Sequence, residues 1–111
     1  MTEKILGKIS SAEYGQLKAM PFLFGLQLTF SLHGGSQGVS DGGQYTINIS
    51  DSCEWESEES RYLAMMELIN HTDAILNAAK VNYVSELVGK PVEVELENNT
   101  FKSFRILTEV L

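Results

Sequence analysis

Cysteine, proline and positive charge are scarce in this chain, and it has no long apolar run. The single Cys53 cannot close an internal disulfide, and a lone thiol is ordinary in a reducing compartment. No apolar run is long enough to cross a bilayer, so we expect no contact with a membrane. The first residues, MTEKILGK, lack an apolar core before a small-residue cleavage site, which argues against secretion. We therefore expect an intracellular protein.

Basic residues are missing from one region in particular. The net charge is −7, and residues 41–59 contain six acids and no Lys or Arg. Such a local field repels a nucleic-acid backbone and attracts basic protein surfaces, so nucleic acid is a disfavoured partner. A solvated acidic face that favours the start of a helix explains the same residues equally simply. The candidate protein interface here is Asp51, Glu54, Trp55, Glu56, Glu58 and Glu59.

The 111 residues, 43% of them apolar, predict a single domain over residues 1–111. Apolar side chains alternate perfectly from Phe22 to Leu32, which is typical of a strand with one face against helices. Its length predicts a twist or bulge near Gly25. Weaker alternation predicts a first strand over 4–9, then a turn or bulge before Pro21.

Later segments complete the expected α+β fold. The period becomes helical from Ser57 to Ala79, with Ser57 as N-cap. One apolar stripe consists of Tyr62, Met65, Met66, Ile69, Leu76 and Ala79, with Leu68, Thr72 and Ile75 beside it. A short helix is expected over 83–88, ended by Gly89. Strands at 92–96 and 100–111 flank a turn at Asn98 and Asn99, and the last strand looks central or part of an oligomer contact. We expect an antiparallel sheet of four or five strands on one long and one short helix.

The most unusual stretch is the glycine-rich segment HGGSQGVSDGG, residues 33–43. It lies between the strand ending at Leu32 and a shorter alternating run from Tyr45 to Ile49, which predicts a long hairpin closed by a glycine-rich loop. Its glycines would let the main chain approach an anion closely. However, the segment matches neither G-x-x-x-x-G-K-[ST] nor G-x-G-x-x-G, and a strand follows where those motifs need a helix. A loop that orders on a ligand and an inert mobile loop both remain open.

Catalytic and metal chemistry find little support. Ser36, Ser40, Asp41 and His33 share the segment, but their spacing gives no nucleophile a positioned base. His33, Asp41, Cys53 and His71 show no close ligand spacing, and His71 is better explained as a partly buried, hydrogen-bonded histidine. We therefore expect no enzyme activity, no metal and no cofactor.

Aromatic and basic residues around the segment suggest binding instead. Tyr45 and Trp55 flank the returning strand, where a ring could stack on a base. Trp55, among glutamates, fits either a protein-interface anchor or a lid over a ligand. Arg105 stands in an apolar strand, where its charge needs a partner: a phosphate, or Glu93 or Glu95 across the hairpin. The candidate ligand site is Gly34, Gly35, Ser36, Gly38, Asp41, Tyr45, Trp55 and Arg105.

Several blocks of this sequence resemble a family of small, largely uncharacterised bacteriophage and prophage proteins. The blocks are AEYG, PFLFGLQL, DGGQYTINIS, KVNYVSELVGKPVEV and FKSFRILTEVL, and the similarity covers nearly the whole chain. The resemblance implies a phage-encoded protein of the host cytoplasm. It supplies no catalytic residues. Small phage proteins of this kind often inhibit host defences or adjust replication.

Three functions are consistent with these observations. The leading one is a non-catalytic counter-defence protein that binds and sequesters a small nucleotide-derived immune signal. The alternative is an acidic inhibitor that docks on a host defence nuclease or another defence protein. The third is an accessory to phage replication or recombination. We also expect the chain to form a homo-oligomer.

Overall fold

The computed structural model describes residues 2–34 and 38–110, which form an antiparallel sheet beside one long helix. The strands are β1 (Thr2–Gln16), β2 (Leu23–Leu32), β3 (Gly38–Ser40), β4 (Thr46–Asn48), β5 (Pro91–Glu97) and β6 (Thr100–Ile106). The helix α1 spans Glu58–Ala79, and two single 3-10 turns, η1 and η2, span Val84–Leu87 and Thr108–Val110. The expected α+β class and long helix are confirmed. The expected short helix is only one 3-10 turn.

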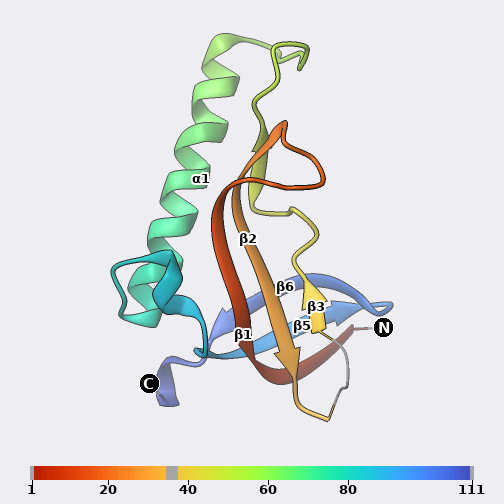
Figure 1. The fold of residues 1–111 in the computed structure, drawn as a ribbon, viewed down its shortest axis with the longest axis vertical. Coiled ribbons are helices and arrows are strands. Elements are labelled where there is room, and N and C mark those ends of the chain that lie inside the picture. The colour runs from red at the N-terminus through yellow and green to blue at the C-terminus, as the bar shows by residue number, and fades with distance from the viewer. Residues whose placement is uncertain (1, 35–37, 111) are drawn as a thin grey trace.

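The sheet order is β3-β2-β1-β5-β6. The strand β4 also pairs with β2, at residues 23–25, whereas β3 pairs with residues 29–31. Figure 1 shows β5 and β6 crossing the lower part of β1 and β2, while α1 runs along one side of these two strands. The last strand was predicted to be either central or part of an oligomer contact. It is not central, because β6 lies at the edge of the sheet and ends at Ile106. Strand order depends on long-range pairing, which local alternation does not encode.

The core lies between the sheet and the inner side of α1, closed below by η1. Its centre consists of side chains with no exposed surface, namely Ile9, Leu26, Leu28, Phe30, Leu87, Val92 and Val94. Three of these belong to the alternating apolar series of β2, as that pattern predicts. Phe22, the first member of the predicted series, is instead 45% exposed.

The irregularity in the long hairpin falls in β1 rather than near Gly25. Ile9 pairs with Phe30 and Ser11 with Thr29, so Ser10 is the extra residue of a bulge and β1 bends there. Gly25 serves a different purpose. A Cβ at this position would lie 2.5 Å from the Tyr45 carbonyl oxygen and 3.1 Å from Leu68 Cδ1. The missing side chain therefore lets both β4 and α1 approach β2.

The ends of the helix follow their sequence signals. Ser57 accepts a hydrogen bond at Oγ from the Ser60 N–H over 3.1 Å, which confirms it as the N-cap. Lys80 adopts a left-handed conformation immediately after the helix, which ends at Ala79 as predicted. Asn98 and Asn99 have φ of 52° and 65°, as a tight hairpin turn between β5 and β6 requires. No helix in the described part of the chain is long and apolar enough to span a membrane.

Candidate functional site: a groove between α1 and the sheet

The glycine-rich segment is divided into two turns, because Gly38–Ser40 forms β3 and pairs with β2. The predicted single long loop is therefore wrong, although the hairpin is confirmed. The second turn, Asp41–Tyr45, joins β3 to β4 and is called the aspartate turn below. Gly42 and Gly43 have φ of 67° and 81°, a conformation that glycine adopts without strain.

Asp41 organises this turn from inside the protein. Its carboxylate is only 3% exposed and accepts hydrogen bonds from the N–H groups of Leu28 at 2.8 Å and Gly43 at 3.0 Å. Burial raises the pKa of Asp41, and the two backbone hydrogen bonds from Gly43 and Leu28 oppose that rise. The Asp41 N–H donates to the Leu28 carbonyl. Asp41 is thus a structural anchor of the turn rather than a group presented to a ligand.

The aspartate turn also contacts β6 and α1. Gln44 donates its side-chain amide to the Lys102 carbonyl over 3.0 Å, which ties the turn to β6. Tyr45 stacks on His71 of α1, with ring centroids 4.7 Å apart and an interplanar angle of 19°. The other surroundings of Tyr45 are aromatic, with Phe101 and Phe104 in edge contact. Contacts with α1 and β6 therefore hold Tyr45 in place.

Two hollows lie on either side of the Tyr45–His71 pair, and together they form the helix groove. The N-terminal hollow, about 290 Å³, is lined by Gln44, Tyr45, Thr46, Ile47, Ala64, Glu67, Leu68 and His71. The C-terminal hollow, about 380 Å³, is lined by Gln44, Tyr45, His71, Ala74, Ile75, Ala78, Ser103, Phe104, Arg105 and Ile106. Gln44, Tyr45 and His71 line both. These sizes lie near the lower limit for small-molecule sites, about 300–1,000 Å³.

The phenol of Tyr45 remains protonated over a wide pH range. Burial, with a smaller contribution from the charge of Asp41, raises the pKa of Tyr45 to about 12. At neutral pH its hydroxyl is therefore a hydrogen-bond donor and acceptor, not a base. His71 is exposed, contrary to the predicted partly buried histidine, and its ring is available to solvent at the groove.

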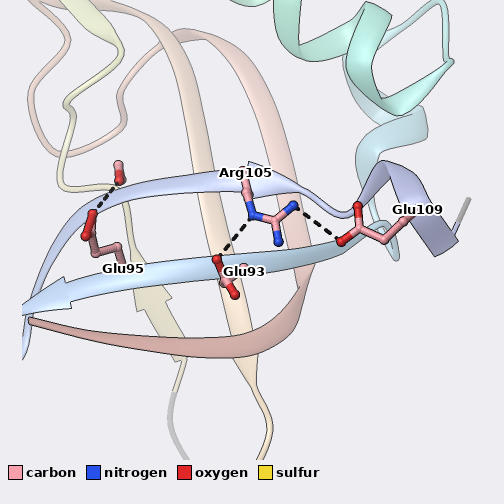
Figure 2. A network of polar contacts seen from close by, with 5 residues as sticks. Glu93, Glu95, Arg105 and Glu109 are labelled. Atoms are coloured by element: carbon pink, nitrogen blue, oxygen red, sulfur yellow. Dashed lines mark hydrogen bonds and ion pairs between the residues drawn. The ribbon is translucent and has the colours of Figure 1, made fainter.

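Arg105 lines the C-terminal hollow and also, with Glu93 and Glu95, a smaller hollow of about 130 Å³. Its guanidinium faces two carboxylates (Figure 2). Its Nε is 3.2 Å from Glu93 Oε1, and its Nη1 is 3.4 Å from Glu109 Oε1. The hydrogen bond that Arg105 donates to Glu93 is the main cause that raises the pKa of Arg105. The predicted cross-strand partner Glu93 is confirmed, whereas Glu95 accepts from Ser103. The side chains of Arg105 and Glu109 are 55% and 56% exposed, so these two can exchange partners.

The structure brings together only part of the predicted ligand site. Tyr45 and Arg105 line the C-terminal hollow, and Asp41 supports Tyr45 from within. Gly34 follows β2 and Gly38 begins β3, while Trp55 belongs to the segment before α1, at the opposite end of Figure 1. Gly35 and Ser36 lie outside the described residues. His71, Gln44 and Glu67 were missed because no local sequence signal relates α1 to the aspartate turn.

The predicted protein interface forms a separate surface. Asp51, Glu54, Glu56, Glu58 and Glu59 are all exposed, and Trp55 among them is half-buried. They occupy the segment between β4 and α1 and the first turn of α1, away from β5 and β6 (Figure 1). Within the described residues, no group of three or more His, Cys, Asp or Glu side chains is placed to hold a metal ion.

Comparison with known proteins finds no matching family model, no similar curated protein and no similar solved structure.

Proposed function

We propose that this chain is a non-catalytic binding protein that holds a small nucleotide-like ligand in the helix groove. The Tyr45–His71 pair carries the proposal, because it places aromatic surface between two hollows at a point fixed by contacts with α1 and β6. A base contacts the exposed imidazole of His71, while the Gln44 amide supplies hydrogen bonds to its edge.

Arg105 is the group proposed to meet the phosphate. It lines the same hollow as the aromatic pair, and its guanidinium can pair with a phosphate in a bidentate manner. Its present partners are carboxylates at the protein surface, so a phosphate would replace Glu109 at little cost. Glu93 would remain to orient the guanidinium from β5. The net charge of −7 repels anions in general, so the proposed binding of a phosphate depends on the position of Arg105.

The resemblance to phage proteins gives this binding its proposed role. A phage-encoded protein in the host cytoplasm that binds a nucleotide-derived immune signal lowers its free concentration and so blunts the host defence. Sequestration needs no chemistry, which agrees with a Tyr45 phenol that stays protonated and neutral below a pKa of about 12.

Calorimetry against a panel of cyclic and linear nucleotides tests the proposal. We expect heat with at least one member, a loss of about tenfold or more in affinity for Arg105→Gln and for His71→Ala, and little change for Lys102→Gln. Lys102 is the matched control, since it is also a cation on β6 but pairs with Glu97 at 3.8 Å, outside both hollows. The absence of heat with every nucleotide would refute it.

Mass spectrometry of the mixture separates sequestration from catalysis. The ligand should be recovered unchanged after long incubation with the protein. Conversion of the ligand to a new species would overturn the non-catalytic part of the proposal.

The second candidate is an acidic inhibitor of a host defence nuclease or another defence protein. Its support is the exposed acidic segment with half-buried Trp55, which lies on a surface separate from the helix groove. Reversal of Glu54 and Glu56 to lysine should then abolish inhibition, whereas reversal of Glu13 and Glu86, also exposed, should not. Binding of this kind also weakens as salt rises. Inhibition that survives reversal of Glu54 and Glu56 would exclude this candidate.

A further inference from the structure

The side of α1 that faces away from the sheet carries large apolar side chains. Tyr62, Leu63, Met66 and Ile69 are 58%, 52%, 57% and 61% exposed. They are called the outer helix patch below. The apolar stripe predicted from the sequence included Tyr62, Met66 and Ile69, but these three residues are exposed in the structure. The residues of α1 that the sheet buries are Leu68, Ile75 and Ala79.

The patch has the spacing of a helix contact. Tyr62, Met66 and Ile69 follow one another at intervals of four and three residues, so they form one straight seam along the helix. Leu63 widens the seam on one side. Figure 1 shows the strands of the sheet along one side of α1. In water, a continuous row of large apolar side chains is normally covered by another surface.

The area of the patch fits a second copy of the same chain. Its four side chains expose on the order of 400 Å² together, already comparable with the largest patch on an ordinary monomer. Two copies face to face would hide about twice that area. To reach the roughly 1,000 Å² that a specific interface needs, the contact must also include neighbouring polar residues.

The charges around the patch also suit self-association. Asn70 adjoins it laterally and is neutral, whereas the exposed acid Glu67 borders it beside Leu63. The acids Glu59 and Asp73 lie beyond its two ends, where solvent screens them. A chain with net charge −7 can therefore meet its own copy here without placing like charges at the centre of the contact.

We propose that the outer helix patch is the contact surface of a symmetric homodimer. In a two-fold contact the same patch serves both copies, and its central residue lies next to the symmetry axis. Met66 is that residue, so it meets Met66 of the second copy, while Tyr62 and Ile69 pack on either side. The helix groove lies on the inner side of α1 and stays open in each copy. The proposal does not depend on the ligand proposed above.

Sedimentation equilibrium over a wide range of protein concentrations tests it. We expect the intact chain to show twice the monomer mass, and Met66→Glu and Met66→Lys to weaken association at least tenfold, each as a folded monomer by circular dichroism. Val88→Glu is the matched control, because Val88 is equally exposed, at 52%, but lies away from the patch. This control should remain dimeric.

Mixing the two Met66 variants tests the position of the symmetry axis. If Met66 of one copy lies beside Met66 of the other, glutamate and lysine become partners, and the mixture should recover the dimer. Raised salt should leave the unmodified dimer intact or strengthen it, since its contact is apolar and its end charges are alike. A monomer at all concentrations, or two Met66 variants that stay dimeric alone, would overturn the proposal. Failure of the mixture to recover would overturn the two-fold arrangement.

Discussion

The phenol ring of Tyr45 lies against the imidazole of His71, 4.7 Å between centroids, and this contact joins the aspartate turn to the middle of α1. Stacked aromatic pairs contribute about 0.5–1.5 kcal/mol beyond the area they bury. A double-mutant cycle with Tyr45→Leu and His71→Ala should therefore give a coupling free energy of about 1 kcal/mol in chemical denaturation. Additive effects of the two substitutions would show that the rings do not stabilise each other.

Tyr45 should make the fold sensitive to alkaline pH. Its pKa is about 12 in the folded state and about 10 when unfolded, so the folded protein retains a proton that the unfolded chain loses. The stabilisation is complete below pH 10 and disappears as pH rises through 12. The loss should be at most about 2 kcal/mol, since the side chain still reaches solvent. Unfolding by denaturant at several pH values measures it.

The control for this effect is Tyr45→Phe, which should lose less stability over the same pH range. Absorbance of tyrosinate offers a second measurement. Tyr14, Tyr62 and Tyr83 are exposed, so one late-ionising group should be visible in the intact protein and missing from the variant. If all tyrosines ionise together in the intact protein, the burial assigned to Tyr45 is incorrect.

Asp41→Ala should destabilise the protein by about 3 kcal/mol. The substitution leaves the N–H groups of Leu28 and Gly43 without their acceptor, and each unpaired, buried donor costs about 1–3 kcal/mol. The matched control is Asp51→Ala, because Asp51 is an exposed acid of the same region and its removal should change stability by less than about 0.5 kcal/mol. Equal effects would mean that Asp41 acts only through net charge.

Alanine substitutions at Gly15 and Gly25 distinguish the cost of backbone strain from the cost of steric overlap. The two glycines pair with each other across β1 and β2, and both have φ of 151°. Alanine at Gly15 meets nothing within 4 Å, so its cost should be the strain alone, about 1–3 kcal/mol. Alanine at Gly25 overlaps the Tyr45 carbonyl and crowds Leu68, which should add at least about 1 kcal/mol.

Thermal or chemical unfolding of both variants gives the comparison. Gly25→Ala should also weaken the ligand affinity of the helix groove, since Tyr45 must shift. If Gly15→Ala proves as damaging as Gly25→Ala, the close approach of β4 to β2 does not contribute.

Local patterns predicted the elements of this fold better than their arrangement. Neighbouring residues alone determine three confirmed features: the alternation in β2, the Ser57 cap and the turn at Asn98 and Asn99. The partner of Arg105 was predicted from hairpin geometry, because Glu93 lies directly opposite it.

The orientation of α1 could not be predicted in the same way. The helix is apolar on both sides, so its period fits either face, and only packing on the sheet selects Leu68 and Ile75. The sequence did not predict the helix groove for a related reason. Tyr45 and His71 belong to different elements, and their contact depends on the two positive-φ glycines and the buried carboxylate that shape the aspartate turn.

The central place of β1 has a consequence for the order of folding. Along Thr2–Lys8 this strand pairs with β5, so Thr2 meets Glu97, while Gly7–Gln16 pairs with the adjacent β2. During synthesis the hairpin of β1 and β2 can form early, but the other edge of β1 stays unpaired until β5 has been synthesised. Pairings of such sequence separation slow folding, and they leave a nascent chain with an open edge that can pair with other chains.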